Sequence, residues 1–411
     1  MKKAAITLGL TISFLFTQAQ LTWLKLPDYP GQGRLGVNSL AIGNFGYIGM
    51  GYDGSTGNSD WHQYNPGSNT WTQMASLPSA AGLWSSVTFV INNLGYIVTG
   101  AKSPGLTNTT WEYNPGTNSW AAKATFPGVA RENAAGFAIG TKGYVGTGYG
   151  NSTTWNDFYE YDQPSDTWTA KAAFPGLTRS GAAGLSIGSK GYIGVGNNTA
   201  STFNFQDFYE YDPSLNVWSQ KSDFPLPYIV EPTEYSSSTN GYILGGFYYQ
   251  YSSITFNPLN MMYKYDQDSD VWTLAGTFCG LPRGYAGGFA IGNDIYVGAG
   301  AQRNDGLAAW MINDFWKLTN GLTLAVQSSS ESIDFKISPN PTDKWIIIDA
   351  TMAGKKTKNL RIYDITGKMI TTIALKNAHE PIDVSSLSKG MYFVELVTKE
   401  NEVFDSKFII Q

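Results

Sequence analysis

The sequence predicts an all-β protein in two parts, a closed ring of repeated four-stranded sheets followed by a small Ig-like β-sandwich. Three observations lead to this prediction. Aromatic residues make up 14% of the 411-residue chain and glycine contributes 46 residues, which suits short strands joined by tight turns. A long unit recurs through the first three quarters of the chain. Beyond residue 320 this rhythm stops and lysine becomes more frequent.

The N-terminal residues 1–19 are typical of a secretory signal peptide. Lys2 and Lys3 form a basic start, residues 4–16 are apolar, and small residues precede the expected cleavage point after Ala19. We therefore expect the chain to be exported. The alternative is a buried N-terminal helix.

A tyrosine and a tryptophan seven residues apart mark the repeat. The pairs are Tyr64/Trp71, Tyr113/Trp120, Tyr161/Trp168, Tyr211/Trp218 and Tyr265/Trp272. The residues between them include Asp, Asn and Pro, which favour tight turns, so each pair predicts a hairpin. A glycine-rich hairpin such as "FAIGTKGYVGTG" precedes each pair. Successive marker tryptophans lie 49, 48, 50 and 54 residues apart, and each unit therefore supplies four strands.

The sixth unit reaches "NDFWKL" and then lacks its tryptophan strand. The missing strand is expected near the other end of the chain, in "LTWLKLP", because Trp23 lies 48 residues before Trp71. Units of this size bury their faces by packing radially, as in a β-propeller, and closure removes exposed sheet edges. We expect a six-bladed β-propeller over residues 20–320. An array of β-sandwiches is the alternative.

The repeat region resembles the kelch-repeat family of β-propellers over residues 21–320. The glycine-rich second strand, the tyrosine of the third strand and the tryptophan of the fourth carry this resemblance. One departure is that a full glycine pair occurs only at Gly245-Gly246. The resemblance implies a six-bladed kelch-type propeller.

Four arginines occupy one register of the repeat, near the start of the innermost strand. They are Arg34, Arg131, Arg179 and Arg283, four of the six arginines in the chain, and the remaining two blades carry Leu83 and Ile229 there. We expect the guanidinium groups to surround the mouth of the central channel, on the face with the variable loops. There they would bind a carboxylate or phosphate. Alternatively they bond to carbonyl groups within the blades.

Two further residues complete the candidate site. Trp84 and Glu231 lie beside the two positions where arginine is absent. An aromatic face next to polar groups suits a sugar, although Trp84 also suits the core. We therefore expect a ligand-binding site built from the four arginines, Trp84 and Glu231.

Several function classes are disfavoured. The chain has two histidines and one cysteine, so we expect no metal site, no cofactor and no internal disulfide, and we expect Cys279 to be a small buried residue. A lone cysteine and a lone propeller histidine do not suit the copper radical oxidases built on kelch propellers. A net charge of −5 gives no nucleic-acid surface, and no second apolar run is long enough to span a membrane.

A linker is expected over residues 321–332, followed by a β-sandwich over residues 333–411. The latter resembles the type A sorting domain of the type IX secretion system, found on exported proteins of the Bacteroidetes. "SPNPTD", "YDITGK", "IDVSSLSKGMYFVEL" and the terminal "KFIIQ" carry this resemblance. It implies contact with the secretion machinery, passage through the periplasm and outer membrane, and release or surface attachment. A carbohydrate-binding sandwich is the alternative.

We therefore expect a secreted or cell-surface propeller that binds a glycan or a protein, and we assign no catalytic residue. One alternative is an enzyme acting on acidic sugars, such as a sialic-acid mutarotase or epimerase, in which Glu231, Glu132 and the arginines would act. A purely structural surface component is the third possibility.

Overall fold

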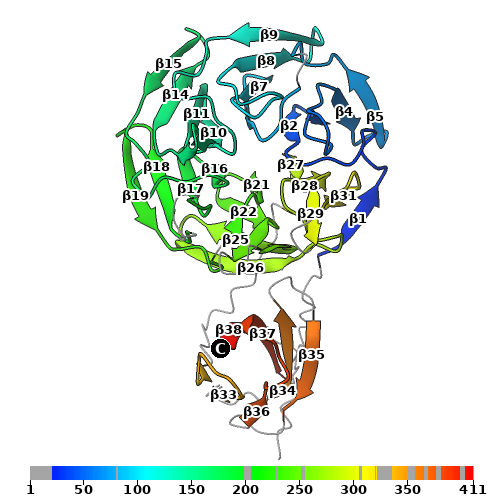
Figure 1. Cartoon of the computed structure of the whole chain (residues 1–411), viewed down its shortest axis with the longest axis vertical. Coiled ribbons are helices and arrows are strands. Elements are labelled where there is room, and N and C mark those ends of the chain that lie inside the picture. Colours follow the sequence, from blue (N-terminus) through cyan, green and yellow to red (C-terminus); the bar gives the residue numbers. More distant parts are fainter. Residues whose placement is uncertain are drawn as a thin grey trace, which may run out of the picture.

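The computed structural model describes residues 21–79, 82–198, 205–227, 229–250, 255–304, 308–319, 321, 336–349, 357–364, 369–375, 381–398 and 403–410. Within these residues the regular elements are β-strands and no α-helix occurs. The first part forms a β-propeller around a central channel, and the last part forms a small β-sandwich (Figure 1). The expected signal peptide, 1–19, and nearly all of the expected linker, 321–332, lie outside the described residues.

Three antiparallel four-stranded sheets, here called blades, come from the first half of the ring. The first contains β2 (Asn38–Ile42), β3 (Phe45–Gly49), β4 (Trp61–Asn65) and β5 (Thr70–Met74). The second contains β6 (Val87–Ile91), β7 (Leu94–Val98), β8 (Thr110–Asn114) and β9 (Ser119–Lys123). The third contains β10 (Ala135–Ile139), β11 (Lys142–Gly146), β14 (Phe158–Asp162) and β15 (Thr167–Ala170).

Three more blades come from the second half. The fourth contains β16 (Ala183–Ile187), β17 (Lys190–Gly194), β18 (Phe208–Asp212) and β19 (Val217–Lys221). The fifth contains β21 (Thr233–Ser236), β22 (Asn240–Leu244), β25 (Met261–Asp266) and β26 (Val271–Thr277). The sixth contains β27 (Gly287–Ile291), β28 (Asp294–Gly298), β31 (Phe315–Leu318) and β1 (Trp23–Leu26).

The sixth blade takes its outermost strand from the start of the described chain. β1 pairs antiparallel with β31, and Trp23 lies opposite Leu318. Each of the other five blades sets its tryptophan opposite the marker tyrosine, as Trp71 lies opposite Tyr64. The innermost strands β2, β6, β10, β16, β21 and β27 contact one another in that order, and β27 contacts β2. The ring is therefore closed, without a free sheet edge between the first and last blades.

The repeated phrase of the third and fourth strands is explained by contacts with the preceding blade. The hydroxyl of Tyr161 donates to Oδ1 of Asp166 at 2.7 Å, and the same oxygen accepts the N–H of Ala124 from the preceding blade. Nε1 of Trp168 donates to the Ala124 carbonyl at 3.0 Å. The same three bonds recur at Tyr113/Asn118/Trp120, Tyr211/Asn216/Trp218 and Tyr265/Asp270/Trp272. These repeated residues of the third and fourth strands therefore bond each of these four blades to the preceding blade.

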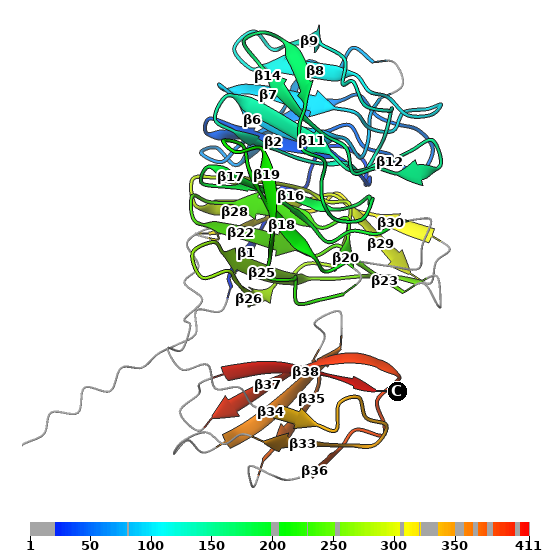
Figure 2. The same cartoon turned by 90° about the vertical axis from the view of Figure 1, so that its left-hand side faces the viewer.

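Short extra sheets extend one side of the ring. They are β12 (Tyr149–Gly150) with β13 (Thr153–Thr154), β20 (Ile229–Val230) with β23 (Phe247–Gln250) and β24 (Thr255–Pro258), and β29 (Ala301–Asn304) with β30 (Ala308–Met311). Most of these strands belong to loops between second and third blade strands, and they lie together at the right of Figure 2. This is the face on which we expected variable loops.

The C-terminal sandwich consists of two sheets. One contains β32 (Lys336–Ser338), β33 (Trp345–Asp349) and β36 (Pro381–Asp383), and the other contains β34 (Thr357–Asp364), β35 (Met369–Ala374), β37 (Gly390–Thr398) and β38 (Val403–Ile410). Ile346, Leu360 and Phe408 lie in its buried core. Met391 and Phe393 pack against the apolar cluster shared by the fourth and fifth blades, so the sandwich contacts the propeller.

The expectation for Cys279 is wrong, because this residue is exposed. Its neighbour Phe278 takes the inward position, where it is 2% exposed and contacts the ring of Trp23. The side chain of Cys279, the next residue, therefore lies on the side exposed to solvent.

Trp23→Ala is expected to lower the stability of the propeller strongly. Trp23 is 8% exposed and packs edge-on against Phe278 at 4.8 Å, so its loss leaves a cavity at the ring closure that costs about 3–5 kcal/mol. Leu24→Ala is the matched control, because Leu24 lies on the same strand and is 56% exposed. Urea unfolding followed by tryptophan fluorescence measures both. Equal shifts of the two midpoints would show that β1 does not hold the ring together.

Candidate functional site

Six residues at the start of the innermost strands form a closed ring of main-chain hydrogen bonds. They are Gly36, Ser85, Asn133, Gly181, Glu231 and Tyr285, and all have positive φ, between 52° and 63°. Each N–H donates to the carbonyl of the preceding member at 2.8–3.2 Å, and Gly36 donates to Tyr285 to close the circle. We call this set the upper ring. Left-handed backbone is unusual outside glycine, and here all six blades support one another in adopting it.

A second set of channel residues lies three positions further along the same strands. It consists of Ser39, Thr88, Gly136, Gly184, Glu234 and Gly288, here called the lower ring. Oγ of Ser39 accepts the N–H of Gly288 at 2.9 Å, and the hydroxyl of Thr88 donates to the Ser39 carbonyl at 2.8 Å. A Cβ on Gly184 would stand 2.7 Å from the main chain of Gly136, so glycine is needed where β10 and β16 approach closely.

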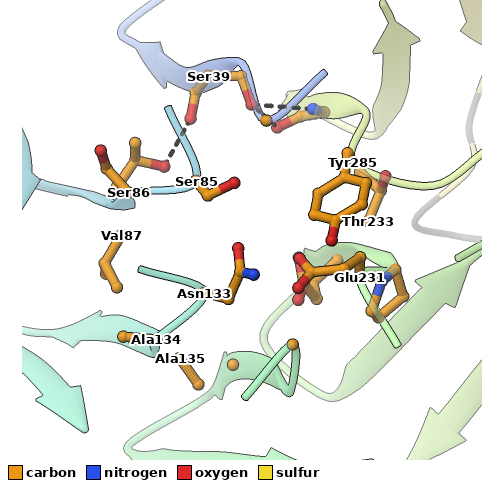
Figure 3. Close-up of a pocket in the computed structure, with 18 of the residues that line it drawn as sticks. Ser39, Ser85, Ser86, Val87, Asn133, Ala134, Ala135, Glu231, Thr233 and Tyr285 are labelled. Carbon is orange, nitrogen blue, oxygen red and sulfur yellow. Dashed lines mark hydrogen bonds between the residues drawn. The ribbon is translucent and has the colours of Figure 1, made fainter. Parts of the chain in front are cut away.

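The two rings line a cavity of about 280 Å³ in the central channel. The side chains of Ser85, Asn133, Glu231 and Tyr285 surround the same space (Figure 3). They stand at equivalent positions of four different blades, yet each offers different chemistry. The wall of the cavity is therefore polar where these side chains lie, and it is not symmetric about the axis of the channel.

Glu231 directs its carboxyl into the space that the absent side chain of Gly181 leaves. A Cβ on Gly181 would stand 2.7 Å from Oε1 of Glu231. No hydrogen bond to this carboxyl is present among the described residues. Burial raises the pKa of Glu231 well above its usual value, and the nearby carboxyls of Glu132 and Glu234 raise it further. The fold therefore disfavours the charged form of Glu231.

Glu234 is the second carboxyl of the same blade. Burial raises its pKa to about 8, although N–H groups of Gly184 and of Glu234 itself partly offset this effect. No lysine, arginine or histidine is present among the described residues that line the cavity. Neither glutamate thus has a protein cation beside it in the cavity.

Two more polar atoms near the cavity have no partner within the described part of the chain. Oδ1 of Asn133 is buried without a hydrogen-bond donor, and Oγ of Ser86 is buried without any hydrogen bond. Unsatisfied buried polar atoms are costly and rare in folded proteins. Together with Glu231 they are hydrogen-bonding groups that the fold does not use.

The four arginines do not surround the mouth of the channel, and the alternative expectation, that they bond to carbonyl groups within the blades, is confirmed. The guanidinium of Arg131 is fully buried inside its own blade. It donates to the carbonyls of Val129 and Thr147 and to Oδ2 of Asp157, each at 2.8 Å. Arg34, Arg179 and Arg283 make the same kind of contacts, with Asp60, Asp207 and Asp314 as partners. A carboxylate of the same blade thus neutralises each arginine. None of the four arginines lines the cavity.

The sequence carries a signal for these ion pairs that the arginine register alone misses. An aspartate stands four residues before the marker tyrosine in three of the blades with arginine, and four residues before Leu318 in the sixth. In the two blades where Leu83 and Ile229 replace arginine, Thr109 and Met261 replace the aspartate. The two charges are present or absent together, which indicates an internal ion pair.

Of the six candidates, only Glu231 lines the cavity. The Trp84 ring instead contacts Tyr52, with ring centroids 5.1 Å apart. Ser85, Asn133, Tyr285 and Glu234 are site residues that sequence reasoning missed. Three of these four stand two positions after the arginine register, and that spacing is the signal that would have found them.

Among the described residues no group of three or more His, Cys, Asp or Glu side chains is arranged to hold a metal ion. The same residues include no helix long and apolar enough to cross a bilayer.

The C-terminal region matches a known family. Residues 336–411 match the model of the secretion system C-terminal sorting domain. The protein therefore carries the signal for export by type IX secretion to the cell surface or the medium, and this domain contacts the secretion machinery.

Two other comparisons concern single proteins. Funoran endo-beta-hydrolase of Wenyingzhuangia aestuarii is 29% identical over 91 residues, which is 22% of this chain and 12% of that protein. The chain thus spans about an eighth of this curated relative. The solved structure of YjhT superimposes with a TM-score of 0.60 over 70% of this chain and 95% of that one, at 16% identity. At this identity the likeness concerns the fold alone.

Arg131→Ile is expected to cost about 3–5 kcal/mol of stability, because it leaves Asp157 half-buried without its partner. The double variant Arg131→Ile/Asp157→Met copies the Ile229/Met261 pair of the fifth blade and should recover most of this loss. Chemical denaturation of the two variants and the parent chain measures the recovery. A double variant no more stable than the single one would contradict an internal ion pair.

Stability is expected to fall as the pH rises from about 4.5 to about 8. The pKa of Glu234 is raised from 4.5 to about 8 in the fold, so in this window the unfolded chain is ionised and folding must take up a proton. Glu234→Gln should remove this part of the slope and stabilise the protein at pH 8 by a few kcal/mol, at about 1.4 kcal/mol per pKa unit. Thermal unfolding between pH 4.5 and 8.5 measures it. Asp28→Asn, at an exposed carboxylate on the outer rim, is the control and should leave the slope unchanged.

Proposed function

We propose that this protein is an exported six-bladed kelch-type propeller that binds a glycan in its central cavity. Cleavage after Ala19 and removal of residues 333–411 after export would leave the propeller as the mature protein. The upper ring forms the ligand-binding face in this proposal, and Glu231 is the one original candidate that it retains.

One observation carries the proposal, namely that the cavity holds polar groups that the fold does not use. The main chain of the upper ring supplies all six ring bonds, so its side chains are not needed for closure. Ser85, Asn133 and Glu231 nevertheless line the cavity, and no hydrogen bond to the Glu231 carboxyl is present among the described residues. Convergent polar groups in a concave site favour a ligand.

The size and chemistry of the cavity suit a sugar unit. Its volume of about 280 Å³ is near the lower end of the roughly 300–1,000 Å³ typical of small-molecule sites. Hydrogen bonds can be both donated and accepted by three groups of the wall, as by sugar hydroxyls. These groups are the hydroxyl of Ser85, the amide of Asn133 and the carboxyl of Glu231 in its protonated form. The Tyr285 ring adds an apolar surface on the same side (Figure 3).

The comparisons add little to the choice of ligand. The likeness to YjhT concerns the fold, and the match to funoran endo-beta-hydrolase covers too few residues to include the whole propeller. The name of that relative speaks of a polysaccharide for that protein alone. The glycan proposal therefore depends on the cavity itself.

A second candidate function is proton transfer on a small sugar, as in a mutarotase or epimerase. The specific observation in its favour is that Glu231 faces the cavity with a strongly raised pKa, which suits a general acid. An acidic sugar such as sialic acid fits less well, because the four arginines that would receive its carboxylate are bound to aspartates.

Asn133→Ala is expected to weaken glycan binding at least tenfold, because it removes two donors and an acceptor from the cavity wall. A glycan array identifies ligands of the exported chain, and calorimetry measures their affinity. Asn92→Ala is the matched control, because Asn92 also has positive φ, 51°, but lies in a turn on the opposite face. An unchanged affinity in Asn133→Ala would place the ligand elsewhere.

The same samples separate binding from catalysis. Acceleration of anomer exchange, seen by NMR and lost in Glu231→Gln, would favour the enzyme over the binding protein. Absence of both binding and exchange would leave the structural surface component as the best account.

A further inference from the structure

The charges of the cavity restrict its ligand, and this inference rests on the proposed function of glycan binding. We infer that the cavity selects a sugar unit with a free, protonated amino group over its N-acetylated, neutral or acidic counterparts. The ammonium group would bind beside the carboxyl of Glu231.

The first argument is the sign of the charges at the site. The cavity is lined by two glutamates, and no cationic side chain is present among its described lining residues. An acidic ligand would add another carboxyl group to a site that already disfavours negative charge. A neutral ligand would leave the carboxyls as they are, whereas a cation supplies the opposite charge that they lack.

The second argument is the balance of donors and acceptors. In its ionised form the Glu231 carboxyl is an acceptor on both oxygens, and no hydrogen bond to it is present among the described residues. An ammonium group has three N–H donors and no acceptor, so it matches such a set. An N-acetyl group offers only one N–H, and its carbonyl would meet further acceptors.

The third argument is the position of the Glu231 carboxyl. It occupies the space left at Gly181, and a Cβ there would stand 2.7 Å from Oε1. The carboxyl therefore lies close against the main chain of the neighbouring blade. The titratable groups that face it are Glu132 and Glu234, both of which also favour a cation. An ammonium beside the Glu231 carboxyl lowers its raised pKa, so any proton on this carboxyl passes to the buffer on binding.

Calorimetry at pH 7 on the full exported chain tests this inference with four matched ligands. They are the methyl glycosides of glucosamine, N-acetylglucosamine, glucose and glucuronic acid. The amine is expected to bind at least tenfold more tightly than the N-acetylated and neutral sugars, and the acid least tightly. In buffers of different ionisation enthalpy, only the amine should release a proton.

Two variants connect the preference to Glu231. Glu231→Gln should reduce the amine preference to about twofold or less and abolish proton release. Gly181→Ala displaces the carboxyl and should weaken the same preference. Alanine is tolerable there because Ser85 and Asn133 adopt similar φ at equivalent ring positions. Unfolding curves confirm that each variant is folded, and Asn92→Ala should keep the full preference.

The outcomes separate the two proposals. Equal affinities for the amine and its N-acetylated form, or a preference that survives in Glu231→Gln, would overturn the amine inference and leave glycan binding intact. If none of the sugars binds, methylammonium becomes the probe. Its binding, lost in Glu231→Gln, would support the amine site and contradict glycan binding, whereas no binding would contradict both.

Discussion

The closed ring of six main-chain hydrogen bonds at the channel is the constraint on which the rest of the propeller depends. Every blade donates one N–H and accepts one at its upper ring residue, so the circle exists only when the first and last blades meet. β1 also closes the ring, at the outer rim. It completes the sixth blade, and that blade contacts the first blade. The ring of hydrogen bonds at the axis and the pairing of β1 at the rim therefore both require the six blades to follow one another in this order.

This arrangement divides the repeat into a constrained outer part and a free inner part. In the outer strands the Tyr, Asx and Trp side chains bond to the preceding blade, and the Arg–Asp pairs fill the blade interior, so these residues recur. In the upper ring the main chain makes the bonds. Side chains as different as those of Gly181, Glu231 and Tyr285 can therefore occupy equivalent positions without opening the ring. Variation at these positions reflects function more than folding.

The sequence predicts the outer part well and the inner part poorly, for a physical reason. Spacing between marker residues locates strands, and it placed Trp23 opposite the last blade because pairing follows the repeat. Spacing does not tell which way a side chain points. The arginine register was therefore found, whereas its direction into the blade, set by an aspartate such as Asp157 twenty-six residues away, was not. Asn133 and Ser85 were missed because their role depends on backbone conformation, which common polar residues do not reveal.

The two carboxyls of Glu231 and Glu234 are a feature of the channel that works against the fold. Glu234 is paired with N–H groups, but its raised pKa means that the fold disfavours its charge, and Glu231 lacks even such partners among the described residues. Leu83 and Ile229 show that this chain removes charges from blade interiors where a partner is missing. In the channel it keeps two carboxyls on one blade without a cation. Protonation offsets part of this cost, because the pKa of both carboxyls is raised. Under the proposed function, a bound group that donates hydrogen bonds or carries positive charge would offset the rest.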